Sequence, residues 1–190
     1  MADASLGKRP WVLWLVGIAL LGMAAALVRA DPRPAVVPYE PTPRAAVAVM
    51  LRLADVGPND VVFDLGCGDG RIVIEAVKVY GARGVCIDID VRRTAIARDN
   101  ARRAGILDRI EFRTQDVLDV SLVDATVVTM FLSPELNLAL RPKLLKELRV
   151  GARVVSHWHD LGDWQPDRTE HVRAAGNTRA VHLWRLPRNR

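Results

Sequence analysis

Cysteine, lysine and aromatic residues are scarce in this chain of 190 residues. Its two cysteines, Cys67 and Cys86, are too few for a disulfide framework, and their spacing does not suggest a zinc site. We therefore expect both to be reduced, buried residues and the chain to work in a reducing compartment. The net charge of +5 rests on 23 arginines and only 4 lysines. Because no dense basic block is interleaved with aromatic residues, we do not expect a nucleic-acid partner.

Charged residues are absent from one N-terminal run, WVLWLVGIALLGMAAALV, at residues 11–28. As a helix it spans about 27 Å, close to a hydrocarbon core of about 30 Å. Three interpretations compete: a membrane anchor, a cleaved signal peptide and a buried core helix. Val28-Arg29-Ala30 would permit cleavage, but the run is long for the core of a signal peptide. We therefore favour a single transmembrane anchor within residues 1–30.

A proline-rich segment follows at residues 31–43, with Pro32, Pro34, Pro38, Pro41 and Pro43. This spacing opposes helix and strand, and it predicts an extended, semi-rigid strap. The alternative is a simple linker. At its end, Thr42 is expected to cap a helix that has Pro43 as its first residue.

Apolar patterns of strand and helix alternate through residues 44–190. Such alternation predicts an α/β domain with a mostly parallel sheet covered by helices on both faces. Ala175-Gly176-Asn177 indicates the turn of a terminal antiparallel hairpin. We expect strands at 61–65, 84–89, 109–113, 125–131 and 152–156, two more within 170–186, and helices at 44–54, 71–80, 91–104 and 134–148.

A glycine-rich loop lies between the first expected strand and the helix that follows. Gly66, Gly68 and Gly70 allow the backbone to approach a ligand closely, and the helix presents free amides at its N-terminus. The spacing G-x-G-x-G differs from the G-x-G-x-x-G of dinucleotide enzymes. Asp64, at the end of the strand, would repel a pyrophosphate but suits a cationic amino group. The loop therefore indicates a ligand that carries an amine.

Acidic residues also follow the next two expected strands. Asp88 is placed to accept hydrogen bonds from ribose hydroxyls, while Asp90 is expected to cap the following helix. Asp116 is placed to accept from an adenine amino group, and Val117 offers its amide and an apolar contact. The alternatives are that Asp88 is only a turn residue and Asp116 only a solvated loop residue.

Together, the D-x-G-x-G-x-G loop and the acids after the second and third strands resemble the cofactor site of class I methyltransferases. The resemblance covers most of residues 40–186. It implies the Rossmann-like fold of that class, a seven-stranded sheet with a C-terminal antiparallel hairpin, and S-adenosyl-L-methionine (SAM) as the cofactor. Because SAM is made inside cells, we expect the catalytic domain to face the cytoplasm.

A narrower resemblance rests on PYEPTP at 38–43, DLGCGDGRIVIEA at 64–76, Ser133-Pro134-Glu135 and LRPKLLKELRVGARVVSH at 140–157. These segments are similar to membrane-anchored mitochondrial protein-lysine methyltransferases of the ADP/ATP carrier and ATP synthase subunit c, and to bacterial relatives. The resemblance implies that Tyr39 and Thr42 close over the cofactor and that the acceptor is a lysine of a membrane protein. Glu40 departs from it, since an apolar residue is expected there, and so does the loop at 131–134. A small-molecule or lipid methyltransferase and a non-catalytic SAM-binding module are the alternatives.

The methyl acceptor is expected at the carboxyl edge of the sheet, after the fourth strand. Phe131, Ser133 and Glu135 are our candidates for lining its slot. The alternative is that Ser133-Pro134-Glu135 is simply a helix start. His157-Trp158-His159-Asp160 permits three interpretations: a metal site, strand-end residues at the mouth of the slot, or structural residues. With no third metal ligand at a useful spacing, we expect no metal.

Overall fold

The structure is a computed structural model in which residues 40–174 and 176–187 are described. The expected anchor at residues 1–30 and the strap as far as Tyr39 lie outside these residues. Within them, no helix combines the length and the hydrophobicity needed to cross a bilayer.

Strands and helices alternate as expected, with bounds that differ by no more than two residues from the predicted ones. The helices are α2 (Arg44–Leu53), α3 (Arg71–Tyr80), α4 (Val91–Arg103) and α5 (Pro134–Glu147), with a 3-10 turn at Leu107–Arg109. The strands are β1 (Val61–Leu65), β2 (Arg83–Asp88), β3 (Ile110–Thr114), β4 (Val127–Met130), β5 (Arg153–His157), β6 (Arg168–Ala174) and β7 (Asn177–Arg185).

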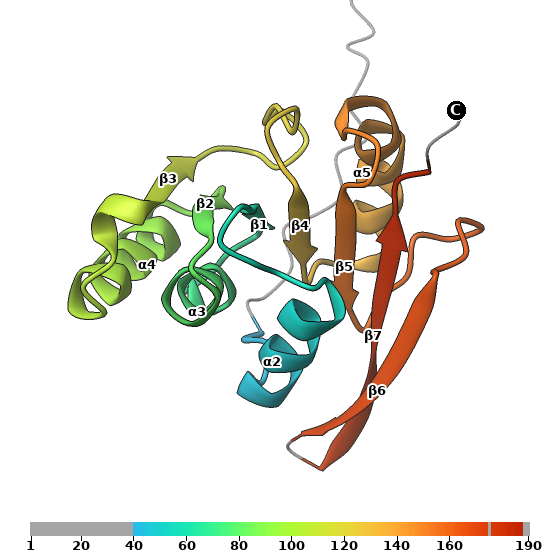
Figure 1. Cartoon of the computed structure of the whole chain (residues 1–190), viewed down its shortest axis with the longest axis horizontal. Helices are drawn as coiled ribbons and strands as arrows, with labels where there is room; N and C mark the ends of the chain where they lie inside the picture. Colours follow the sequence, from blue (N-terminus) through green and yellow to red (C-terminus); the bar gives the residue numbers. More distant parts are fainter. Residues whose placement is uncertain (1–39, 175, 188–190) are drawn as a thin grey trace, which may run out of the picture. The chain divides into compact units, whose positions relative to one another are not determined.

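All seven strands form one sheet in the order β3-β2-β1-β4-β5-β7-β6 (Figure 1). The strands β1 to β5 are parallel, and β7 runs antiparallel to both β5 and β6. The predicted seven-stranded sheet and its reversed terminal hairpin are therefore confirmed. The chain order reverses between β1 and β4, and ligands of open α/β sheets bind at such a switch point.

Side chains of successive strand residues point to opposite faces, and this divides the core into layers. On one face, Val62, Val127 and Val155 pack with α2 and α3. On the other face, Phe63 and Val128 pack with Leu140 and Leu144 of α5. A third apolar cluster holds α3 and α4 against β2. The two layers leave the carboxyl ends of the parallel strands as the edge available to a ligand.

The N-terminal caps of two helices agree with interpretations of the sequence, and the cap of a third does not. Asp90 caps α4 by accepting from the amide of Arg92 at 2.8 Å, as predicted. Ser133 caps α5 by accepting from the amide of Leu136 at 3.3 Å. The predicted Thr42 cap is wrong, because extended Pro43 occupies the cap position and no side chain caps α2. Thr42 is instead buried, and its carbonyl accepts from Arg71 at 2.9 Å.

Close packing of α3 on β2 depends on Gly84. A Cβ there would collide with Cγ2 of Val73 and approach Cγ2 of Val77 within 3.2 Å. We expect Gly84→Ala to lower the free energy of unfolding by about 1–3 kcal/mol, measured by urea titration. Gly57→Ala is the matched control, because a Cβ at Gly57 meets nothing within 4 Å. Equal stability of the two variants would contradict the tight packing of α3.

Candidate active site

The glycine loop between β1 and α3 is folded tightly back against β2. Gly66, Gly68 and Gly70 all have positive φ, at 73°, 56° and 78°. The amides of Gly66 and Cys67 both donate to the carbonyl of Ile87, at 2.8 and 2.9 Å. A Cβ on Gly66 would lie 2.5 Å from Cδ2 of Leu132, so only glycine lets the loop after β4 approach this closely.

Asp64 lies in β1, directly before this loop, with its side chain 1% exposed. Its Oδ1 accepts from the hydroxyl of Thr129 in β4 at 2.8 Å. Its Oδ2 is buried and has no hydrogen-bond partner among the described residues. The pKa of Asp64 is raised to about 7, chiefly by burial; the hydrogen bond from Thr129 opposes this shift, and the nearby charges of Asp88 and Asp69 add to it. Such a carboxyl group lacks the partner that a cationic ligand would supply.

Asp88 ends β2 on the same edge of the sheet. Its Oδ2 accepts from the amide of Gly68 at 2.9 Å, and its Oδ1 accepts from the amide of Asp90 at 3.0 Å. Each carboxylate oxygen can accept more than one hydrogen bond, so both remain usable by a ribose hydroxyl. Ile89, directly after it, is 53% exposed and offers an apolar surface at the same edge.

Asp116 and Val117 follow β3, whose end is joined to β2 by the amide of Gln115 donating to the carbonyl of Asp88 at 3.0 Å. Oδ1 of Asp116 accepts from the amide of Leu118 at 2.9 Å, which fixes the turn. The side chain of Val117 is buried in the core beneath α5. Any contact between Val117 and a ligand therefore falls to its backbone amide.

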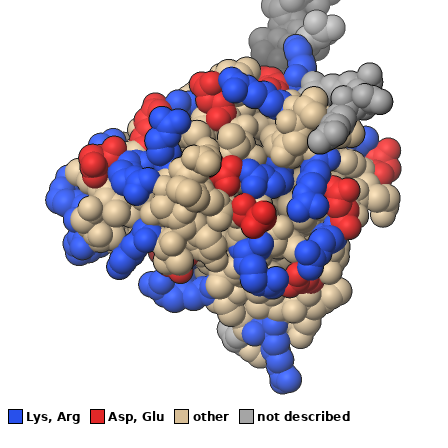
Figure 2. Space-filling view, in the orientation of Figure 1, with Lys and Arg blue, Asp and Glu red and all other residues tan. Residues whose placement is uncertain are grey.

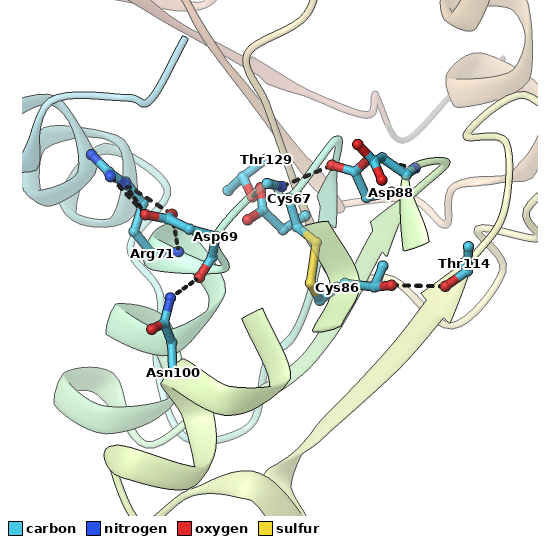
Figure 3. Close-up of a disulfide and its surroundings, with 12 residues drawn as sticks. Cys67, Asp69, Arg71, Cys86, Asp88, Asn100, Thr114 and Thr129 are labelled. Atoms are coloured by element: carbon cyan, nitrogen blue, oxygen red, sulfur yellow. Dashed lines mark hydrogen bonds and ion pairs between the residues drawn. A yellow bond between two sulfur atoms is a disulfide. The ribbon is translucent and has the colours of Figure 1, made fainter. Parts of the chain in front are cut away.

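The expectation that both cysteines are reduced is wrong, because Cys67 and Cys86 form a disulfide (Figure 3). In the parallel register, Asp64 lies opposite Cys86, and the tight loop turns Cys67 back over that strand. The Cα atoms of the two cysteines are 5.4 Å apart, within the range of a disulfide. The bond ties the glycine loop to β2, and the cysteines no longer argue for a reducing compartment.

The end of the strap is fastened to the glycine loop through Arg71. Its guanidinium forms an ion pair with Asp69 at 2.7 Å (Figure 3). It also donates to the carbonyl of Thr42. Asn100 of α4 donates to the carbonyl of Asp69 at 2.8 Å, which holds the loop from the other side. The contact places the carbonyl of Thr42 against Arg71 at the start of α3, and the closure of Thr42 over the cofactor stays a prediction. Tyr39 lies outside the described residues.

Aromatic side chains gather at the carboxyl ends of β4 and β5. The rings of Phe131 and His157 meet edge to face at a centroid distance of 4.5 Å. Trp158 and His159 stack at 4.7 Å, and Phe131 lies 6.5 Å from Trp158. No group of three metal-ligating side chains occurs in the described part of the chain, so the metal interpretation of this segment has no support there.

Arg179 of β7 completes this cluster. Its guanidinium carbon lies 3.9 Å from the ring centroid of Trp158 and 5.9 Å from that of Phe131. It also forms an ion pair with Glu40 at 2.6 Å. Burial, and then the charge of Arg179, lower the pKa of His157 to about 4, so this imidazole is neutral at physiological pH.

Comparison with known proteins identifies the family. Residues 64–168 match the ANTKMT methyltransferase domain. The chain belongs to this family. It is 40% identical to a protein-lysine N-methyltransferase of Saccharolobus islandicus, over 78% of this chain and 92% of the relative. It is 38% identical to the adenine nucleotide translocase lysine N-methyltransferase of Mus musculus, over 68% of this chain and 56% of the relative.

A solved structure identifies the cofactor of the family fold. An RNA methyltransferase from Salinibacter ruber, in complex with S-adenosyl-L-homocysteine (SAH), is 49% identical to this chain with a TM-score of 0.74. The match covers 79% of this chain and 95% of that structure. The present chain is therefore a SAM-dependent methyltransferase, as its glycine loop and acids predicted.

The residues of this methyltransferase fit SAM at the edge formed by β1, β2 and β3. The unpartnered Oδ2 of Asp64 suits the amino group of the methionine part. Asp88 is placed for the ribose and Asp116 for the adenine, which is the order predicted from the sequence. Their contacts with SAM remain predictions.

The three residues predicted to line the acceptor slot lie in different surroundings. Phe131 lies within the aromatic cluster, and its role in the acceptor slot stays a prediction. Ser133 instead caps α5, which agrees with the alternative interpretation. Glu135 is exposed in the first turn of α5, where its own backbone amide and the hydroxyl of Ser133 lower its pKa.

Several residues around the site had no signal in the sequence. Thr129 reaches Asp64 only through the pairing of β4 with β1, 65 residues apart. Asn137 of α5 is buried and donates to the carbonyls of His159 and Asp160, both at 3.1 Å, which fixes the turn after β5. No local pattern marks Arg179.

Proposed function

We propose that this enzyme transfers the methyl group of SAM to the ε-amino group of a lysine in a membrane protein. The observation that carries the proposal is the cluster of Phe131, Trp158 and Glu40 around Arg179 at the carboxyl ends of β4 and β5. Aromatic faces and a carboxylate together attract an ammonium group, and the rings also pack against its alkyl chain. The lysine methyltransferases among the relatives support the same acceptor.

The reaction is an in-line displacement in which the lysine nitrogen attacks the methyl carbon and the carbon–sulfur bond breaks. SAM supplies a methyl group that is electrophilic because it is bonded to a sulfonium. The enzyme's own task is to position the amine, exclude water and admit the lysine without its proton. Phe131 and the neutral His157 form an apolar and uncharged wall for this purpose. The amine proton leaves to solvent.

We also propose that the enzyme is attached to a membrane. The uncharged run at residues 11–28 supports a single N-terminal helix that holds the catalytic domain at the membrane. The supply of SAM supports a domain that faces the cytoplasm, whereas the Cys67–Cys86 disulfide weighs against that side, because stable disulfides are rare in reducing compartments. The mouse relative is named for the adenine nucleotide translocase, which supports a membrane protein as the acceptor.

RNA is the second candidate acceptor, and the name of the Salinibacter structure favours it. The charge pattern favours protein. On the face shown in Figure 2, basic and acidic side chains are interspersed rather than gathered into a basic patch. Nucleic-acid sites depend on clustered positive charge.

The test is to incubate the full-length enzyme with methyl-tritiated SAM, in the presence of membrane or soluble cell extracts. The class of molecule that becomes labelled identifies the acceptor. We expect a labelled membrane-protein band that yields methyl-lysine on acid hydrolysis. The Asp64→Asn variant is the control, because label that persists with it comes from other enzymes in the extract. Label confined to RNA, lipid or small molecules would contradict the lysine proposal and leave the methyltransferase.

A further inference from the structure

Arg179 occupies a site built to hold a cation. Its guanidinium lies over Trp158 at 3.9 Å and near Phe131 at 5.9 Å, and Glu40 neutralises it at 2.6 Å. We call Glu40, Phe131 and Trp158 the cation cage. Cation–π contacts and a carboxylate do not distinguish a guanidinium from an ammonium, so the cage would hold either.

The backbone of Trp158 is held in place by its surroundings. Its φ is 73°, which is unfavourable for a bulky side chain and persists only where neighbouring contacts impose it. The amide of Trp158 donates to the carbonyl of Ala180 at 2.7 Å. The strand that supplies Arg179 thus also holds the backbone of the residue on whose ring Arg179 lies.

Phe131 links the cage to the cofactor loop along the chain. Phe131 directly precedes Leu132, the residue that packs against Gly66 of the cofactor loop. Glu40 and Arg179 also line a pocket with His157. His157 is 1% exposed, and its Nδ1 has no hydrogen-bond partner among the described residues. An amine that enters this pocket would find an acceptor for one of its N–H groups.

We propose that Arg179 holds the place of the substrate lysine, and that the lysine must displace it from the cation cage to be methylated. The inference rests on the proposed lysine acceptor. Arg179 is then an internal competitor of the substrate, whereas Glu40 and Trp158 bind the substrate once Arg179 has left. The side chain of Arg179 is 17% exposed, so its cage contacts are partly shielded from solvent.

Under this proposal, substitution of Arg179 and substitution of Glu40 change the affinity for a cation in opposite directions. Without Arg179 the cage is vacant, so Arg179→Gln should bind a cation about three- to tenfold more tightly than the wild type. Glu40→Gln removes a ligand of the cage and should bind the cation several-fold more weakly. A purely structural ion pair would shift the affinity in the same direction in both variants.

The test is titration of the full-length enzyme with n-butylammonium, the analogue of a lysine side chain, followed by NMR of the indole of Trp158. Arg173→Gln is the matched control, because Arg173 is an exposed arginine on β6 of the same hairpin. Trp158→Ala, at a residue 43% exposed, should weaken the inhibition of methyl transfer by n-butylammonium. Affinity that is unchanged or lowered in Arg179→Gln overturns the inference.

Failure of the inference can be told from failure of the proposed function. Methyl-lysine formed by the wild type, with unchanged affinity in Arg179→Gln, rejects the role of Arg179 and keeps the lysine acceptor. Tighter n-butylammonium binding by Arg179→Gln, with label only in RNA or lipid, keeps the cage and rejects the lysine acceptor.

Discussion

Replacement of Asp64 by asparagine is expected to weaken SAH binding on the order of 100-fold without unfolding the enzyme. Oδ2 of Asp64 is buried and lacks a partner among the described residues, and we expect it to bind the amino group of the cofactor. Loss of a charge-assisted hydrogen bond to a buried group costs about 2–5 kcal/mol of binding. Asparagine keeps the size of the side chain and an oxygen for Thr129.

Stability and affinity should change in opposite directions in this variant. In the cofactor-free enzyme above pH 7, an ionised Asp64 is buried without a cation, so Asp64→Asn should be at least as stable as the wild type. Calorimetric titration with SAH and thermal unfolding measure the two quantities. Asp124→Asn, at an exposed aspartate, is the control. A variant that binds SAH normally would contradict the role of Asp64.

The same carboxyl group gives the binding of SAH a pH dependence. Its pKa in the folded protein is about 7, above its ordinary value of 3.8, so cofactor-free stability falls from about pH 4 to pH 7. The ionised form binds the amine, so SAH affinity should rise up to tenfold per pH unit from pH 5 and level off above pH 7. Titrations across this range should show proton release on binding, and Asp64→Asn should abolish the slope.

Reduction of the Cys67–Cys86 disulfide is the second large effect. The bond joins residues 19 apart in sequence, and the loss of such a loop closure lowers the free energy of unfolding by about 3 kcal/mol in the chain-entropy model. For a domain of this size the melting temperature should fall by about 6–12 °C. Because the bond also ties the glycine loop to β2, SAH binding should weaken as well.

Thermal unfolding with and without a phosphine reductant measures this effect. Cys86→Ala is the control, since a protein without the pair should not respond to the reductant. Alkylation followed by mass spectrometry should find no free thiol before reduction and two afterwards. Two free thiols in the untreated enzyme, or an identical melting temperature with and without the reductant, would contradict a disulfide that stabilises the fold.

Local patterns in the sequence were sufficient to predict the fold and the identity of the cofactor, whereas the residues that bind it stay a prediction. The apolar run at Val61–Leu65, the three glycines and the caps at Asp90 and Ser133 each act within a few residues, so their structure follows from their own chemistry. The acids after β1, β2 and β3 then meet at one edge because parallel strands end together.

Contacts between distant residues account for what the sequence did not reveal. Arg179 and Glu40 are 139 residues apart, and only the hairpin folding over α2 brings them together. The disulfide was missed because it depends on the register of β1 against β2, which places Cys86 opposite Asp64. Thr42 failed as a cap because α2 begins one residue later, with Pro43 at the cap position, and the carbonyl of Thr42 makes a tertiary contact with Arg71.

A crystal structure of the enzyme with SAH tests the account of the site most directly. We predict the amino group of SAH within hydrogen-bonding distance of Oδ2 of Asp64, the ribose hydroxyls on Asp88, and the adenine beside Asp116 and the amide of Val117. The sulfur should point toward the cation cage. SAH that lies away from Asp64, or with its sulfur facing away from Phe131, would contradict the account.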